Sequence, residues 1–477
     1  MPGTMRRRFP KAPVVTLGAV ARPDERIVIA CCLLIGAATV LLAPALGYDA
    51  WAWMVWAREL TELSLDTTGG PSWKPLPVLV SAPFAWIDGL APFLWLALVR
   101  GAALYAIWLA GRCAARLAGT PAAAAAFVVA AFGLLVSTDL PRTALYGSSE
   151  PLLVAFVLGA VLLHLRDRRL TALSLLALAG LIRPELWLVT LIYGLWCAHH
   201  LGRRRGLIAA LVVVPPLVWV IFDWAGSGGL AQGAATAQGQ TPTSAAREAI
   251  PALEVFSRLG DSVIAPVLVL ALAALVFAWR RRNREVLLLA LLVIGWVAVV
   301  AVMAQLGFTG ARRYLAGPAA LSCVLAGVGA GWLIAAASAR TVKYAATAAI
   351  ALLFLGFGIF VLRTDARLLS VARLDAEQSD QLSGAISAVG GRDAIVAVGK
   401  PAINPYEQTG LAWKLDLPLR DVQGTWNSTQ SQPNWQPPAI VFVAPARVAG
   451  PKPAFAPEQK LKKLSSYGRW EVFRAYR

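Results

Sequence analysis

Long runs of apolar residues, separated by short polar segments, dominate the chain up to about residue 362. A helix needs about 20 consecutive apolar residues to cross the hydrocarbon core of a bilayer. The runs are continuously apolar rather than alternating, so they do not fit the strands of a membrane β-barrel. Two of them, 170–182 and 186–200, are short, and they either form a helical hairpin with its tip below the outer surface or cross a locally thinned bilayer. We predict eleven membrane-spanning helices, at residues 27–46, 92–111, 121–138, 151–165, 170–182, 186–200, 206–225, 263–279, 286–306, 314–337 and 343–362.

The pattern changes after residue 362. Short β-rich runs at 394–399, 439–444 and 470–476 follow a helical pattern at 375–389, and the sequence "YGRW" at 467–470 predicts a hairpin turn. Such alternation is typical of a small α/β domain. The predicted fold is an all-α polytopic membrane protein with a small C-terminal α/β domain. Its predicted parts are a cytoplasmic segment 1–26, a transmembrane domain 27–362 with outer loops 47–91 and 226–262, and an extracytoplasmic α/β domain 363–477.

Composition supports the membrane assignment. Hydrophobic residues make up 58% of the 477 residues and charged residues only 15%, and the mean hydropathy is +0.63. These values lie far from those of water-soluble domains. The first apolar run has no small-residue cleavage site, so we expect it to remain as a membrane anchor.

The distribution of Lys and Arg predicts the orientation. With the N-terminus in the cytoplasm, the inner segments hold 20 Lys and Arg, against 8 in the outer loops before residue 363. Basic loops stay in the cytoplasm. We therefore predict a cytoplasmic N-terminus and an extracytoplasmic C-terminal domain. The same loops account for most of the +18 net charge, so the basic character does not predict a nucleic-acid partner.

Acidic residues show the opposite asymmetry and indicate that any chemistry faces outward. Twelve Asp and Glu lie in or beside the outer loops before residue 363, and four lie on the inner side. The histidines, His164, His199 and His200, are predicted at cytoplasmic span ends. A general base on the outer face is then a carboxylate. All five cysteines lie in or directly beside apolar spans, so we predict neither a disulfide framework nor a thiolate metal site.

The first outer loop contains two contrasting segments. Trp53, Trp56 and Leu60 recur at helical spacing, with charged residues on the other side, which predicts an amphipathic helix at the outer surface. Its tryptophans either form an aromatic belt in the headgroup region or stack on sugar rings. The following "DTTGGPSWKPLP" is rich in Gly and Pro and does not fit a helix. Backbone of this kind is costly in lipid unless it lines a protein cavity.

Four short motifs occur in an order that resembles the GT-C superfamily of membrane glycosyltransferases. Asp49 follows the first span and Lys74 belongs to a "KP" dipeptide about 25 residues later. Glu150 lies in "GSSEPL" at the start of a later span. "GLIRPELWL" at 180–188 is similar to a Leu-x-Arg-Pro-Glu-Gly element, and "ARRYLAGP" at 311–318 is similar to an Arg-Tyr-Leu-x-Pro element. The resemblance covers about residues 27–340.

The resemblance implies a transfer of sugar from a polyprenyl-phosphate donor and assigns roles to these residues. Asp49 would be the catalytic base that deprotonates the acceptor hydroxyl. Fixed cations would stabilise the departing lipid phosphate. The first loop carries one Asp where the family has an acidic pair, and no extended metal cluster follows, so no cofactor is predicted and a divalent metal is not indicated. The predicted substrate-binding residues are Lys74, Glu150, Arg183, Glu185, Arg313, Trp73 and Asp66.

Each of these residues also has a structural alternative. Asp49 suits the cap of the following helix, and Lys74 could extend only to the lipid headgroups. Glu150 precedes Pro151 at a helix start, where the dipole favours a carboxylate. Arg183 and Glu185 could simply pair with each other. Two further alternatives concern Asp223, which is either a substrate contact or a capped polar residue, and loop 226–262, which is either a lid or a plain connection.

The sequence thus predicts an inverting, polyprenyl-phosphate-sugar-dependent hexosyl- or pentosyltransferase, similar to mannosyl-, aminoarabinose- or arabinofuranosyltransferases. Ala, Gly and Arg are abundant, as in GC-rich genomes such as those of actinobacteria, and the predicted location is a bacterial plasma membrane. The predicted acceptor is a cell-wall glycan, a glycolipid or a protein. Two rivals stay open: a transporter or flippase for lipid-linked sugars, which should show paired repeats, and a scaffold that has lost turnover.

Overall fold

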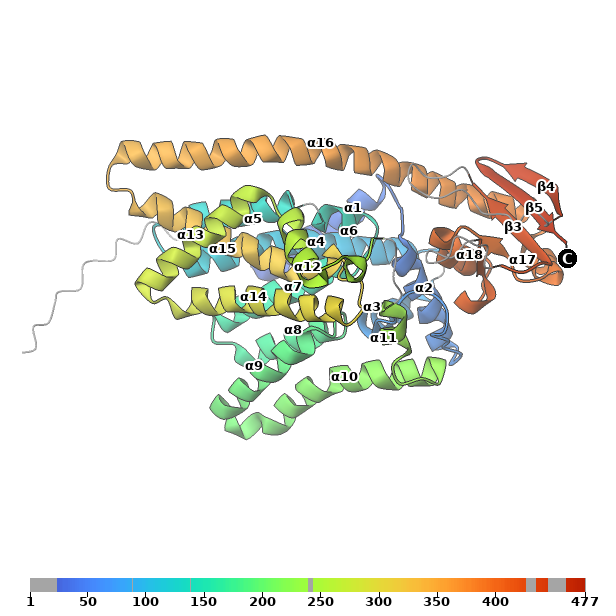
Figure 1. Ribbon diagram of the computed structural model, residues 1–477, viewed down its shortest axis with the longest axis horizontal. Helices are drawn as coiled ribbons and strands as arrows, with labels where there is room; N and C mark the ends of the chain where they lie inside the picture. Colours follow the sequence, from blue (N-terminus) through green and yellow to red (C-terminus); the bar gives the residue numbers. More distant parts are fainter. Residues whose placement is uncertain are drawn as a thin grey trace, which may run out of the picture.

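The computed structural model describes residues 24–87, 89–137, 139–238, 243–425, 435–444 and 460–476, and the side chain of Arg203 lies outside this description. Most of the described chain is helical, and a small sheet lies near the C-terminus (Figure 1). Most of residues 1–26 fall outside the described part, as do 239–242 in the predicted lid loop. The cytoplasmic location of the first segment and the lid both stay predictions.

A described helix overlaps each of the eleven predicted spans. Among the described residues, five helical segments are long and apolar enough to cross a bilayer alone, and the α12–α13 pair, bent by 104°, is a sixth candidate. The chain is a multi-pass membrane protein. The helices over the predicted spans are α1 (Glu25–Val40), α4 (Ala91–Ala118), α5 (Ala123–Leu135), α7 (Glu150–His164), α8 (Arg169–Gly180), α9 (Leu186–His200), α10 (Arg205–Ser227), α13 (Ala265–Arg281), α14 (Arg284–Gln305), α15 (Ala316–Ala336) and α16 (Arg340–Ser387).

Short helices connect these long ones. α2, α3 and α11 lie at the same end of the molecule as the C-terminal sheet (Figure 1). α12 regains the helical pattern that the sequence predicts after residue 244. The connecting elements are α2 (Tyr48–Thr61), α3 (Pro75–Ser81), α6 (Leu140–Leu145), α11 (Gln232–Ala237), α12 (Pro251–Ser262), and the 3-10 helices η1 (Ala82–Phe84), η2 (Gly202–Arg204), η3 (Ala245–Arg247) and η4 (Arg312–Leu315).

Small residues bring the central helix α15 close to its neighbours. A Cβ added to Gly329 would lie 2.0 Å from the carbonyl oxygen of Leu270 on α13, and one added to Gly327 would lie 2.4 Å from that of Ala126 on α5. Helix pairs in membranes use such small residues because van der Waals packing, not burial from water, holds them together. α15 therefore forms the centre of the helical part and fixes the position of η4 before it.

Helix α2 is buried inside the protein, which corrects the predicted surface helix. The side chains of Trp53 and Trp56 are 0% exposed, and Glu59 is also buried. These tryptophans pack edge-on against Trp95 and Trp73 with ring centroids 5.4 Å apart. They neither form a belt in the headgroup region nor are accessible to a sugar. The sequence pattern gives α2 one polar face, and α3 and the C-terminal part cover the helix.

The C-terminal part starts from a helix that does not break where the domain boundary is predicted. α16 continues through residues 362 and 363 and ends at Ser387. The strand order is β2-β1-β3-β5-β4; β1 pairs in parallel with β2 and β3, and β5 pairs antiparallel with β3 and β4. The remaining elements are α17 (Gly391–Val398), α18 (Gln408–Lys414), η5 (Pro405–Glu407), η6 (Leu419–Asp421), β1 (Ala402–Ile403), β2 (Gln423–Gly424), β3 (Ala439–Val443), β4 (Leu461–Tyr467) and β5 (Trp470–Ala475).

Two of the three predicted strands are present, as β3 and β5, and the hairpin turn lies between β4 and β5 as predicted. The third prediction, a strand at 394–399, is wrong because this run forms most of α17. Ile395 is buried there and Val396 is exposed. A short apolar run has no period long enough to distinguish a strand from a helix.

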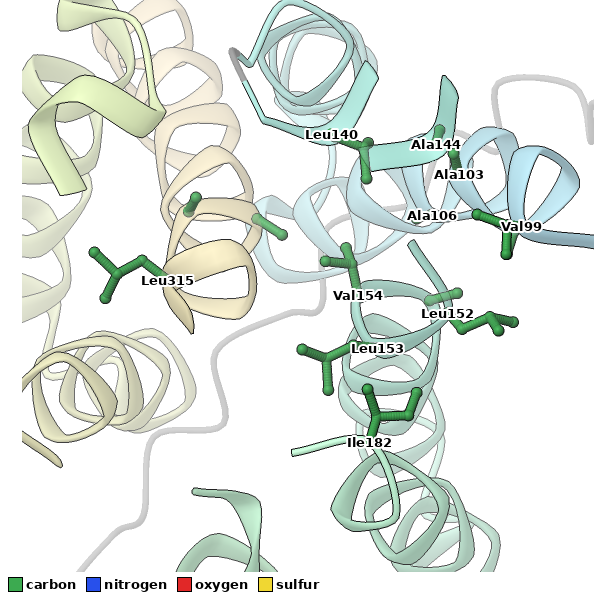
Figure 2. Close-up of a cluster of buried hydrophobic side chains, with 14 of the residues drawn as sticks. Val99, Ala103, Ala106, Leu140, Ala144, Leu152, Leu153, Val154, Ile182 and Leu315 are labelled. Carbon is green, nitrogen blue, oxygen red and sulfur yellow. The ribbon is translucent and has the colours of Figure 1, made fainter. Parts of the chain in front are cut away.

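An apolar core lies beneath the segments that carry Glu150, Arg183 and Arg313. Figure 2 shows side chains from α4, α6 and α7 together with Ile182, in the turn after α8, and Leu315, at the end of η4. Leu153 follows Glu150 by one turn of α7, Ile182 precedes Arg183, and Leu315 follows Arg313 by two residues. The polar side chains at these positions are thus anchored on tightly packed apolar neighbours.

Candidate active site

Five charged side chains from five separate segments converge at one place. Asp49 accepts a hydrogen bond from Arg313, with Nη1 2.6 Å from Oδ2, and lies 3.8 Å from Nζ of Lys74. Lys74 is also 3.8 Å from Oε1 of Glu150, and Arg183 donates to the same oxygen at 2.5 Å. We call these five residues the charged cluster. All were predicted site residues.

The local fold explains how each side chain reaches the cluster. Asp49 is the second residue of α2, Glu150 is the first of α7, and Arg313 lies in η4. Lys74 is extended just before α3, whose first residue is a proline. The backbone N–H of Leu76 donates to the carbonyl of Leu181 at 3.1 Å, which ties the start of α3 to the turn that carries Arg183.

The charged cluster has a closed side and an open side. Glu150, Arg183 and Lys74 are 1%, 4% and 5% exposed. The side chains of Asp49 and Arg313 are 17% and 42% exposed. A ligand can therefore reach Asp49 and Arg313 first, while the deeper groups set the charge behind them.

The charged cluster holds more positive than negative groups. Three cations meet two carboxylates, and ionic groups out of water require close partners to be tolerated. Two atoms buried on the closed side, Nε of Arg183 and Oε2 of Glu150, have no hydrogen-bond partner within the described part of the chain. Lys74 lies over the ring of Trp53 and Arg183 over that of Tyr314, at 5.3 and 4.3 Å from the ring centroids. The surplus of positive charge suits an anionic ligand.

The ionisation of the cluster follows from burial and neighbouring charge. Burial lowers the pKa of Lys74 to about 8, with help from Arg183, although Glu150 and Asp49 oppose the shift. Burial alone would raise the pKa of Asp49, but Arg313 and Lys74 outweigh it and hold that pKa below its ordinary value. Asp49 is therefore a carboxylate at neutral pH.

Three predicted site residues lie outside the charged cluster. Asp66 pairs with Arg420 of the C-terminal part and caps Thr68. Trp73 is buried in the core, stacked on Phe222 with ring centroids 6.0 Å apart. Glu185 is buried, and its Oε2 has no hydrogen-bond partner among the residues that the structure describes. The geometry brings none of these three to the cluster.

The observed contacts of three cluster residues differ from the purely structural roles that the sequence left open. Gly47 is the N-cap of α2 and no side chain caps it, so Asp49 is not the cap. Lys74 is buried and does not extend to headgroups. Arg183 pairs with Glu150 rather than with Glu185.

Two neighbouring polar residues can be compared in the same way. Arg312 lies 4.0 Å from Asp139, apart from the cluster that Arg313 joins. Asp223 accepts a hydrogen bond from the backbone N–H of Gly233 at 2.8 Å. It is therefore a capped polar residue that holds α11.

Similarity to known proteins is found in the structure and not in the sequence. No protein-family model matches the sequence, and no curated protein matches it. The crystal structure of ArnT from Cupriavidus metallidurans bound to undecaprenyl phosphate matches with a TM-score of 0.57 at 14% identity, over 94% of this chain and 97% of ArnT. The apo structure of the same protein matches with a TM-score of 0.54 and the same identity and coverage. The chain has an ArnT-like GT-C fold.

Several residues that support the charged cluster in this GT-C fold were not predicted from the sequence. The hydroxyl of Ser149 is 3.3 Å from Nζ of Lys74. The buried hydroxyl of Thr409, in α18, donates to the carbonyl oxygen of Tyr48 at 2.8 Å, directly before Asp49. Ser149 and Tyr314 border predicted site residues and could have been proposed on that ground. Thr409 is more than 350 residues from its partner, and no local pattern indicates it.

The C-terminal part of the GT-C fold holds α2 at further points. Trp413 packs against Trp51 with ring centroids 6.3 Å apart. Arg58 pairs with Asp416 at 2.7 Å. The helix that presents Asp49 is thus fixed from outside the membrane part.

Within the described ranges there is no group of three or more His, Cys, Asp or Glu close enough to hold a metal ion. The charged cluster itself contributes two carboxylates, and each is already paired with cations. The cofactor-free reaction stays a prediction.

Proposed function

We propose that the chain is an integral membrane glycosyltransferase that moves a sugar from a polyprenyl-phosphate donor to an acceptor hydroxyl. The observation that carries this proposal is the convergence of two carboxylates and three cations on one half-buried site. The GT-C fold supports it, because ArnT, which has the same fold, binds undecaprenyl phosphate. The charge asymmetry of the loops supports an outer-face location in a bacterial plasma membrane.

The cations suit the phosphate of the donor. Lys74, Arg183 and Arg313 are fixed by packing and ion pairs, so they need little reorganisation when the leaving phosphate gains charge. The exposed Arg313 would meet the phosphate first. Lys74 and Arg183 would add their charge from the closed side.

The transfer step balances with Asp49 as the base. The acceptor oxygen bonds to the anomeric carbon while the bond from that carbon to the phosphate oxygen breaks. The bonding electrons leave with the phosphate, and the hydroxyl proton moves to the carboxylate of Asp49. A single displacement of this kind inverts the configuration at the anomeric carbon.

The ion pair between Asp49 and Arg313 gives the donor a way to activate the base. A bound phosphate competes with Asp49 for Arg313 and Lys74, the two cations that hold its pKa down. Losing part of their attraction raises the basicity of Asp49 only when the donor is present. This coupling would restrain proton abstraction in the empty enzyme.

The donor sugar and acceptor extend the proposal further. A pentose or hexose, such as arabinofuranose, aminoarabinose or mannose, fits the lipid-linked donor class. A cell-envelope glycan, glycolipid or protein would supply the acceptor hydroxyl. The C-terminal domain, held against α2, would help to shape the acceptor side.

The decisive experiment uses purified protein in liposomes with a panel of polyprenyl-phosphate sugars and acceptors. We expect one donor to be consumed, and Asp49→Asn to lower the rate by about 10²- to 10⁴-fold, the usual contribution of a positioned base. Asp393→Asn, an exposed change of the same kind, is the control. The proposal fails if no donor is consumed while lipid-linked sugar crosses the bilayer, or if Asp49→Asn is fully active.

A further inference from the structure

An apolar groove runs along the side of the helical part, away from the charged cluster. α1 packs on α4, α4 on α7, and α7 on α8, and a cavity of about 360 Å³ lies along this row of four helices. Close packing seals its base: a Cβ added to Gly36 of α1 would lie 2.5 Å from the backbone of Gly101 on α4. The apolar lining includes Leu33, Leu98, Leu109, Leu152, Phe156 and Leu175.

The polar end of the groove lies at the opposite end of the helices from the charged cluster. Arg166 and Glu25 line it and form an ion pair at 2.5 Å that joins the end of α7 to the start of α1. α7 begins at Glu150, a cluster residue, and Arg166 lies two residues beyond its last residue, His164. A ligand with a polar head at Arg166 would therefore direct its apolar part toward the site without reaching it.

The length of the groove matches one leaflet. Its lining along α7 extends from Leu152 to Leu163, which corresponds to about 16 Å at 1.5 Å per residue. This is about half of the 30 Å hydrocarbon core. An acyl chain of one leaflet fits this length, whereas a polyprenyl chain is much longer.

We propose that this groove binds one acyl chain of a diacyl phospholipid whose phosphate lies beside Arg166, in the leaflet opposite the charged cluster. The charge at this end suits such a headgroup. Arg166 is partly exposed despite its partner Glu25, and Arg168, Arg169 and Arg116 lie on the adjoining segments. Basic residues near the surface attract anionic lipid phosphate. The groove shares no residue with the charged cluster, so lipid binding there is independent of the transferase reaction.

The experiment uses the full chain in nanodiscs that contain a phosphatidylglycerol with a photoreactive acyl chain. After irradiation, mass spectrometry locates the cross-linked residues. We expect cross-links on the groove faces of α4 and α7, and Ala155→Phe, which fills the groove floor, should abolish them. Ala349→Phe, on the exposed surface of α16, is the matched control and should leave them unchanged.

A second variant tests the headgroup without filling the groove. Arg166→Gln should lower cross-linking in the groove about fivefold, as expected for the loss of one cation near a lipid phosphate. The proposal is overturned if the groove residues stay unlabelled in a folded protein, or if Ala155→Phe leaves their labelling intact. It is also overturned if the lipid that co-purifies in the groove is a polyprenyl phosphate.

Discussion

The two ends of α2 are both held by ion pairs, but the pairs differ in burial and in charge balance. At its start, Asp49 joins a cluster whose deeper members are almost inaccessible and whose cations outnumber its carboxylates. Farther along, Arg58 pairs with Asp416, whose side chain is 65% exposed. The comparison teaches that similar ion pairs can serve different purposes. A balanced, solvated pair fastens two parts together, whereas an unbalanced, buried cluster has a surplus of positive charge that suits an anionic ligand.

Among the variants that test this difference, we expect Glu150→Gln to have the largest effect on stability. Glu150→Gln removes the carboxylate that Lys74 and Arg183 share and leaves two buried cations poorly compensated. We expect a loss of about 3–5 kcal/mol in the free energy of unfolding, as is typical when one partner of a buried pair is removed. Thermal unfolding in detergent measures it. The double variant Glu150→Gln/Lys74→Met should recover stability without recovering transfer, and an unchanged unfolding temperature in the single variant would contradict the comparison.

Lys74 provides a pH test of the unbalanced charge. Its lowered pKa of about 8 means that it loses its proton, and with it a phosphate contact, as the pH rises through 8. We expect kcat/KM for the donor to fall about fivefold between pH 8 and 9, in proportion to the protonated lysine, because this parameter reports the free enzyme. The values of kcat should change less, since bound phosphate favours the charged lysine. Lys74→Arg, which stays protonated at these pH values, should remove the fall, and persistence of the fall in that variant would exclude Lys74 as its source.

Thr409 tests whether the C-terminal part positions the base. Thr409→Val removes the hydrogen bond to the carbonyl of Tyr48 while keeping the side-chain shape. Loss of one such bond costs about 1 kcal/mol, and we expect kcat to fall about fivefold with KM for the donor little changed. Thr409→Ser should restore kcat. If Thr409→Val lowers the free energy of unfolding but leaves kcat unchanged, the contact is purely structural.

The smallest expected effect is at the exposed end of α2. Asp416→Asn breaks the pair with Arg58, and exposed pairs contribute between 0 and about 1 kcal/mol. The unfolding temperature should change little, and raising the salt concentration should remove what difference exists. A loss as large as that of Glu150→Gln would erase the distinction between the two ends of α2.

Much of the fold could be predicted because the hydropathy of the sequence is enough to locate membrane helices. The predicted spans all overlap helices, since twenty apolar residues have few alternatives in lipid. Run 394–399 lacked such a constraint, and its six residues suit a strand as well as the helix that they form. The burial of Trp53 and Trp56 depends on α3 and the C-terminal part, which no local pattern shows.

The site followed the same division. Asp49, Lys74 and Arg313 were predicted because short motifs border them, and they do meet in space. Asp66, also a predicted substrate-binding residue, instead pairs with Arg420, which is 354 residues away in the sequence. Trp73 and Glu185 lie next to or near cluster residues in the sequence, but the side chain of Trp73 enters the apolar core and that of Glu185 is buried without joining the cluster. Sequence adjacency does not fix side-chain direction.

Because α16 is continuous, its length sets both the rotation of the C-terminal part about the helix axis and its distance from the membrane-spanning part. Its 48 residues make a rod about 72 Å long, in which each residue turns the chain by about 100°. Adding one residue to the rod would swing the whole domain around its axis and carry Thr409 away from Tyr48. Each added residue also moves the C-terminal part about 1.5 Å along the axis, so even a whole added turn, which restores the rotation, would separate Thr409 from Tyr48.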